Sequence, residues 1–160
     1  MPALRPAQEW TVSGWLNAAE PLTLASLKGR VVYALAFQML CPGCAAHAVP
    51  QALKVRAAFA EDDVAVIGLH TVFEHAEAQG SKEALAAFLH EYKIRFPVAI
   101  DAAAPDGGVP ETMRAYNMQG TPTTILIDRA GNLRLLRFGH VDDLSLGAMI
   151  GSLLGEGASD

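Results

Sequence analysis

Two cysteines separated by two residues, in Cys41-Pro42-Gly43-Cys44, are the residues of this sequence best suited to chemistry. A buried-type apolar run at 31–37 precedes them and a helix-like pattern follows, so Cys41 is expected at the tip of a helix. Two intervening residues place both sulfurs on the first helical turn, close enough to join. The free N–H groups and positive dipole end of that turn favour a thiolate. We predict that Cys41 attacks and that Cys44 resolves.

Composition excludes several classes of protein. The 160 residues are half apolar, which suits a single domain spanning 1–160, with 1–9 as a loose N-terminal arm. A net charge of -5 argues against nucleic-acid binding, and the apolar runs are too short to span a membrane. The N-terminal residues lack the apolar segment of a signal peptide, which predicts a cytoplasmic location. With only two cysteines present, the pair is expected to be catalytic or metal-binding rather than structural.

Hydrophobic periodicity predicts an α/β domain. Apolar runs indicate buried strands before the cysteines and again further along the chain, and Ser81 and Asp142 or Asp143 are expected helix caps. The helix after Cys44 contains Pro50, which should kink it. The expected strands are 10–16, 31–37, 64–69, 96–100, 123–127 and 133–138, and the expected helices follow Cys44 and cover 81–92, 111–116 and 142–154. This order predicts a central mixed β-sheet flanked by helices on both faces.

Three stretches resemble the thioredoxin-like superfamily, and within it the redoxin branch that includes the TlpA-like thiol–disulfide oxidoreductases. They are the C-x-x-C followed by Pro50, the stretch 116–124 that contains Thr121-Pro122, and Ile125-Leu126-Ile127-Asp128 followed by Gly131-Asn132. The match covers about residues 22–154. It implies a thioredoxin-like fold, a cis bond at Thr121-Pro122, and an inserted helix–strand segment at 70–100 before that proline.

The resemblance also implies a function. It implies a thiol–disulfide oxidoreductase in which the Cys41–Cys44 pair exchanges with a disulfide-containing protein or a small thiol substrate, and Thr121 and Pro122 hold the partner chain. An external reductant of the thioredoxin or glutathione type would restore the dithiol, and no bound cofactor is implied. Pro42 and Gly43 would tune the reduction potential of the pair.

Two positions depart from the family pattern. Leu40 precedes the first cysteine where many members have Trp, so partner choice cannot be carried over. His47 stands where some cytochrome-maturation relatives have an acidic residue. Because imidazole titrates near neutral pH, His47 either assists the cysteines or is an exposed residue without a role, and both hypotheses stay open.

Two alternative functions are less consistent with the sequence. A thiol peroxidase would need a hydroxyl three residues before its cysteine, but Gln38 precedes Cys41 and Cys41 precedes Cys44 at that spacing. A non-catalytic redox sensor or metal-binding module remains an alternative, although a zinc site needs four ligands and only one cysteine pair exists.

Two further patterns have an open interpretation. Glu74, His75 and Glu77 either rim the cysteine pair or form a solvated loop, which is the simpler interpretation. The small residues at every fourth position from Gly147 to Gly155 allow close helix packing, against the domain's own sheet or in a homodimer.

Overall fold

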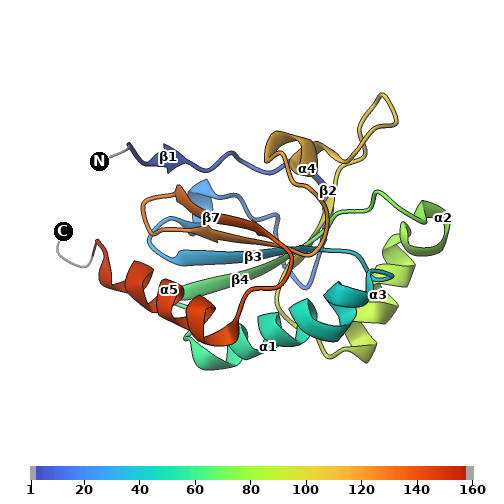
Figure 1. Cartoon of the computed structure of the whole chain (residues 1–160). Helices are drawn as coiled ribbons and strands as arrows, with labels where there is room; N and C mark the ends of the chain where they lie inside the picture. The colour runs from blue at the N-terminus through green and yellow to red at the C-terminus, as the bar shows by residue number, and fades with distance from the viewer. Residues whose placement is uncertain (1–2, 158–160) are drawn as a thin grey trace.

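A seven-stranded mixed sheet forms the centre of the computed structural model, which describes residues 3–157. The strand order is β1-β7-β6-β3-β4-β5-β2. The strands are β1 (Arg5–Pro6), β2 (Val12–Leu16), β3 (Val31–Phe37), β4 (Val64–His70), β5 (Val98–Asp101), β6 (Thr123–Ile127) and β7 (Asn132–Phe138). The helices are η1 (Ala25–Leu27), η2 (Cys44–Ala48), α1 (Val49–Ala58), α2 (Ala76–Gln79), α3 (Lys82–Glu91), α4 (Glu111–Ala115) and α5 (Asp143–Gly155) (Figure 1).

The central strand β3 positions the cysteine pair. It pairs in parallel with β4 along its whole length and antiparallel with β6 on its other side. All seven of its residues are buried, because the run is apolar on both faces and each face is covered. The chain leaves β3 at Phe37 and reaches Cys41 four residues later, so the cysteines lie at the carboxyl end of the sheet's central strand.

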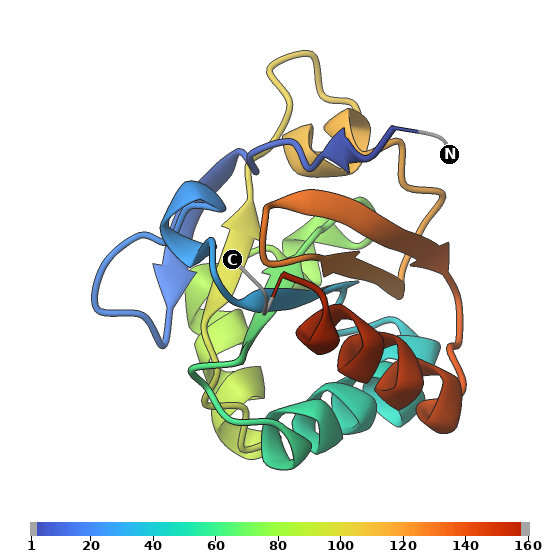
Figure 2. The same cartoon turned by 90° about the vertical axis from the view of Figure 1, so that its left-hand side faces the viewer.

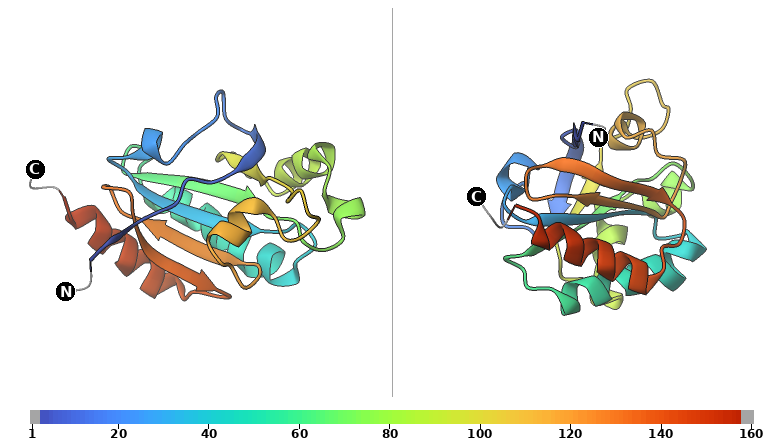
Figure 3. Two further views of the ribbon diagram at one scale, coloured as in Figure 1. Left: turned by 90° about the horizontal axis from the view of Figure 1, so that it is seen from above. Right: turned by 60° about the vertical axis from the view of Figure 1, so that its left-hand side comes forward.

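Helices cover both faces of the sheet. Alternate side chains of β3 pack on α1, α3 and α5 on one face, and the intervening ones pack on η1 and α4 on the other. Figure 2 shows α4 on the opposite side of the sheet from α1 and α5, and both views of Figure 3 agree. This confirms the predicted α/β class and the mixed sheet with helices on both faces.

The helix boundaries follow local sequence signals. Ser81 accepts a hydrogen bond from the Ala84 N–H at 3.1 Å, and Asp142 accepts one from Ser145 N–H at 3.0 Å, so both are N-caps. A π-helical turn, η2, ends at Ala48 and leads directly into α1, which has Pro50 in its first turn. Proline has no N–H with which to continue a regular helical ladder, which explains the change of helix type there.

The structure corrects two expectations. The arm at 1–9 is not loose where it is described, because Arg5 and Pro6 form the edge strand β1, which pairs with β7. The polar stretch that begins at His70 is not wholly solvated: His70 ends the buried strand β4, and Gln79 is only 1% exposed. Glu74, His75 and Glu77 themselves are exposed, as the simpler interpretation of that stretch expects.

The glycine pattern of α5 does not serve close packing on the domain's own sheet. A Cβ built at Gly147, Gly151 or Gly155 meets nothing within 4 Å. The interpretation of these glycines as intramolecular packing positions is therefore wrong, and the homodimer stays a prediction. Among residues 3–157, no helix combines the length and apolar character needed to cross a membrane.

Candidate functional site

The two cysteines are in contact and unbonded. Their Sγ atoms lie 2.6 Å apart, both thiols are free, and the Cys44 N–H donates a hydrogen bond to Cys41 Sγ at 3.3 Å. Cys41 is partly exposed whereas Cys44 is 1% exposed. One sulfur is therefore accessible to a partner, and the second is held behind it on the first turn of η2.

A loop distant in sequence closes over this turn. The Thr121–Pro122 peptide bond is cis, and Cys41 Sγ donates to the carbonyl oxygen of Thr121 at 3.6 Å. A Cβ built on Gly43 would meet Cδ of Pro122 at 3.7 Å, so the proline ring packs directly against the turn between the cysteines. The structure thus brings Cys41, Gly43, Cys44, Thr121 and Pro122 together in one site.

The environment of Cys44 makes it a weak acid. Burial raises the pKa of its thiol to about 12, and the adjacent Cys41 thiol acts in the same direction. The backbone of Gln38 and the side chain of Thr121 act in the opposite direction and lower the pKa of Cys44, but burial outweighs them. A thiol must lose its proton to act as a nucleophile, so Cys44 is the less reactive of the two cysteines in the reduced protein.

His47 lies on η2, one turn after Cys44, and its side chain is exposed. Its ring stands 5.9 Å from that of His140, centre to centre, in an edge-to-face arrangement. Within residues 3–157, no hydrogen bond links His47 to either sulfur. The geometry does not join His47 to the cysteine site, and its role stays a hypothesis.

Two buried glutamines belong to the site although sequence analysis did not assign them to it. Gln38 follows the last residue of β3, and Gln79 ends α2. Gln38 Nε2 donates to Thr121 Oγ1 at 3.1 Å, and Gln79 Oε1 accepts from the Leu40 N–H at 2.9 Å. The signal available was the position of Gln38, a polar residue directly after a fully apolar strand.

His70 is a third residue near this loop that sequence analysis did not assign to the cysteine site. It is 2% exposed, its ring packs against Phe37 at 5.3 Å between centres, and its Nε2 accepts from the Met39 N–H at 3.4 Å. Burial lowers the pKa of His70 to about 4, so the imidazole is neutral at physiological pH. A neutral ring can accept the bond that supports the loop before Cys41.

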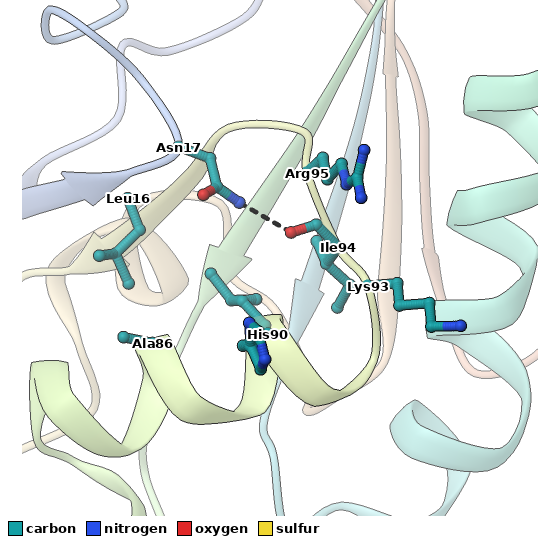
Figure 4. Close-up of a pocket in the computed structure, with 8 residues that line it drawn as sticks. Leu16, Asn17, Ala86, His90, Lys93, Ile94 and Arg95 are labelled. Atoms are coloured by element: carbon teal, nitrogen blue, oxygen red, sulfur yellow. Dashed lines mark hydrogen bonds between the residues drawn. The ribbon is translucent and has the colours of Figure 1, made fainter.

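Among residues 3–157, neither a metal cluster nor the pocket beside α3 offers a comparable site. In the described part of the chain, no three His, Cys, Asp or Glu side chains gather closely enough to hold a metal ion. A pocket of about 520 Å³ lies at the end of α3, lined in part by Leu16, Ala86 and Lys93. Figure 4 shows Lys93 and Arg95 pointing away from Leu16, and the dashed bond is that of Asn17 to the Ile94 carbonyl. No chemically convergent set of side chains forms there.

Comparison with known proteins agrees with the geometry. The family model described as Redoxin matches residues 5–143. The solved structure of the thioredoxin-like superfamily protein SPOA0173 is 57% identical, with a TM-score of 0.93 over 98% of this chain and 99% of that one. A thiol-disulfide isomerase from Corynebacterium glutamicum is 48% identical, with a TM-score of 0.90 over 94% of this chain and 97% of its own.

Curated relatives include Protein DipZ of Mycobacterium bovis and of Mycobacterium tuberculosis. Each is 30% identical over 136 residues, which is 82% of this chain but only 18% of DipZ. The chain therefore corresponds to a small part of those proteins. The match to the family model covers most of the chain, and the cysteine pair beside Thr121–Pro122 lies within it: this chain belongs to the Redoxin family and has its thioredoxin-like fold.

Proposed function

We propose that this protein is a thiol–disulfide oxidoreductase that reduces disulfides of partner proteins. The observation that carries the proposal is the pairing of an accessible Cys41 with a buried Cys44 whose sulfur is in contact with it. The 48% identity to a thiol-disulfide isomerase from Corynebacterium glutamicum supports the same reaction class.

The reaction follows from the positions of the two sulfurs. The Cys41 thiolate attacks one sulfur of the partner disulfide, a mixed disulfide forms, and the other partner sulfur leaves as a thiolate. Cys44 then loses its proton and attacks Cys41, which releases the partner's second thiolate and leaves a Cys41–Cys44 disulfide. The partner gains two electrons and the enzyme loses two. An external dithiol reductant returns the enzyme to its starting state.

Thr121 and Pro122 are proposed to hold the partner chain beside Cys41. The Thr121 carbonyl already lies 3.6 Å from Cys41 Sγ, and Pro122 packs over Gly43. A partner segment that brings its disulfide to Cys41 must therefore pass along this loop. Pro42 is exposed and adjoins the same sulfur, which supports a contact with the partner there.

Trapping tests the proposal directly. With Cys44→Ser, attack by Cys41 cannot be resolved, so a stable mixed disulfide with a disulfide-bonded test protein such as oxidised insulin should accumulate. Cys41→Ser should form none, because Cys44 is buried. The complex is read by mass after alkylation of free thiols. A mixed disulfide in Cys41→Ser but not in Cys44→Ser would reverse the roles assigned to the two cysteines. A mixed disulfide in neither variant would contradict the exchange mechanism.

A redox titration of the wild-type protein tests the direction and, with it, the cytoplasmic location that we keep as part of the proposal. A Cys41–Cys44 couple near about −270 mV would agree with a reductase in a reducing compartment. A reduction potential near about −120 mV would indicate an oxidant and would contradict both the reductase activity and the cytoplasmic location. Oxidation of the pair by hydrogen peroxide with rapid turnover would replace the proposal with the thiol peroxidase alternative. A cysteine pair that is oxidised or reduced once and does not turn over would support the redox-sensor alternative instead.

A further inference from the structure

The turn that presents Cys41 depends on a side chain distant in sequence. Residues 38–41 form a β-turn, closed by a hydrogen bond from the Cys41 N–H to the Gln38 carbonyl at 3.2 Å. Within this turn the Leu40 N–H donates to Oε1 of Gln79 at 2.9 Å. The Leu40 side chain is 54% exposed, whereas Gln79 is 1% exposed. The peptide immediately before the nucleophile is therefore held from the buried side of the turn.

The orientation of the Gln79 amide is fixed by its neighbours. Its Nε2 donates to the Glu74 carbonyl at 2.7 Å and to Gln38 Oε1 at 3.2 Å, so its oxygen must face the Leu40 N–H. Both hydrogens of the NH₂ group and the carbonyl oxygen thus have partners. A buried amide whose polar atoms are all bonded has one preferred position, because any rotation leaves a buried group without a partner.

Gln38 extends this contact to the loop that carries the cis proline. Its Oε1 also accepts from the N–H groups of Phe73 and Glu74, at 3.1 Å and 3.2 Å, and its Nε2 donates to Thr121 Oγ1 at 3.1 Å. The carbonyl of the same threonine lies 3.6 Å from Cys41 Sγ. The segment around α2 therefore holds both the turn before the nucleophile and, through Gln38, the loop opposite it.

The position of Cys41 matters most in the second half of the reaction. Attack on a partner is bimolecular, and a partly exposed sulfur can meet the partner from several directions. Resolution is intramolecular, because the Cys44 sulfur must approach Cys41 Sγ in line with its bond to the partner. In the dithiol the two sulfurs lie 2.6 Å apart, and the Cys44 N–H donates to Cys41 Sγ at 3.3 Å. A turn that let Cys41 swing away would lose this alignment.

We propose that Gln79 is a positioning residue that holds the turn before Cys41 and so speeds resolution of the mixed disulfide; the inference rests on the proposed function. In that step Cys44 loses its proton to solvent, and its electron pair forms the bond to Cys41 Sγ. The bond from Cys41 to the partner breaks, and the partner sulfur leaves as a thiolate. Gln79 takes no part in these bond changes and acts through the Leu40 peptide.

The reagent 5,5′-dithiobis(2-nitrobenzoate) separates the two steps in one stopped-flow trace. Attack by Cys41 releases a first coloured thiolate, and resolution by Cys44 releases a second. Gln79→Met keeps the length of the side chain and removes its hydrogen bonds. It should slow the second release about tenfold, the scale of one buried hydrogen bond, and leave the first within about twofold.

A conservative variant and a matched control complete the kinetic test. In Gln79→Glu the buried carboxyl is protonated at about pH 6.5, because burial raises its pKa, so it accepts from the same peptide N–H and donates to the Glu74 carbonyl. Its second release at that pH should lie within about threefold of the wild-type rate. Gln51→Met is the control: this buried glutamine binds the Val141 carbonyl and Asp143, and its loss should leave both releases unchanged.

Hydrogen exchange followed by NMR reports on the turn itself. In the reduced wild-type protein the Leu40 amide should be protected, although its side chain is exposed. In Gln79→Met this amide should exchange at least about tenfold faster, while the amides of β4 keep their protection. The comparison separates local loosening of the turn from a general loss of stability.

Any of four results would overturn the inference: an unprotected Leu40 amide in the wild type, an unchanged second release in Gln79→Met, equal slowing of both releases, or failure of Gln79→Glu to recover. Where Gln79→Met does not fold, Gln79→Asn takes its place with the same expected result, because its amide is one methylene too short to reach Leu40. A wild-type protein that releases only one thiolate and forms no Cys41–Cys44 disulfide would instead contradict the proposed function.

Discussion

The side-chain amide of Gln38 donates a 3.1 Å hydrogen bond to the hydroxyl of Thr121, 83 positions later in the chain. The bond joins the loop after β3 to the loop before β6, and these two strands are neighbours in the sheet. The first loop leads to the cysteines and the second carries Pro122. The central strands therefore do more than build a core, because they hold the two halves of the site at a fixed separation.

The rate of mixed-disulfide resolution should rise with pH. Burial raises the pKa of Cys44 to about 12, so at neutral pH the thiol is almost wholly protonated. At pH values below this pKa, each rise of one pH unit increases the fraction of Cys44 thiolate about tenfold. Stopped-flow reaction of the protein with 5,5′-dithiobis(2-nitrobenzoate) measures this effect, because resolution by Cys44 releases the second coloured thiolate, and the rate of that release should climb steeply from about pH 7 to about pH 9. A flat profile over that range would show that proton loss from Cys44 does not limit resolution.

The stability of the fold should fall in mild acid because of His70. The pKa of His70 is about 4 in the folded protein against 6.5 for the free side chain, so the unfolded chain binds this proton first. The contribution of neutral His70 to the free energy of unfolding is complete above about pH 6.5 and is lost as the pH falls toward 4. The free energy of unfolding should fall by about 3 kcal/mol over this range. Urea unfolding at several pH values measures it.

His70→Gln is the comparison for that measurement. The variant should be less stable at neutral pH, because it loses the packing of the ring on Phe37. Its stability should nevertheless depend less on pH than that of the wild type between about pH 6.5 and about pH 4. Parallel curves for the two proteins would mean that His70 is not the group that titrates.

Gly68→Ala should destabilise the protein by about 1–3 kcal/mol. A Cβ at this position in β4 would lie 3.0 Å from Val98 Cγ2, 3.2 Å from Phe37 Cε1 and 3.3 Å from Phe96 Cε1, all buried side chains. Gly147→Ala is the matched control, because nothing lies within 4 Å of its Cβ in the middle of α5.

The control should change stability in the opposite direction. Alanine is about 1 kcal/mol better than glycine inside a helix, so Gly147→Ala should raise the melting temperature by a few degrees while Gly68→Ala lowers it. Equal shifts of the two variants, in either direction, would contradict the crowding at Gly68. Thermal unfolding followed by circular dichroism is sufficient to decide.

His47→Ala should change the rate of insulin reduction by less than about twofold, the effect of a side chain not bonded to the sulfurs. The exposed imidazole faces His140, and no bond joins it to Cys41 or Cys44 within residues 3–157. His140→Ala is the control for loss of the ring contact alone. A loss of tenfold or more in His47→Ala only would support the proton-shuttle hypothesis for this residue.

Sequence patterns determined much of the fold because they report local burial. The unbroken apolar runs predicted β3 and β4 as buried strands, and the caps at Ser81 and Asp142 lie where hydrogen bonding to nearby N–H groups favours them. The C-x-x-C spacing predicted adjacent sulfurs, because two intervening residues span less than one helical turn.

Only the tertiary structure decided which distant residues share the site. Gln38, Gln79 and His70 carry no local pattern that marks them, since an isolated polar residue is equally compatible with solvent. Their burial depends on the loop before β6 and the segment around α2 meeting at the end of β3. The same holds for β1, which becomes a strand only because β7 offers it an open edge. Sequence thus determined the cysteine chemistry, and the order of strands in the sheet decided which polar side chains surround it.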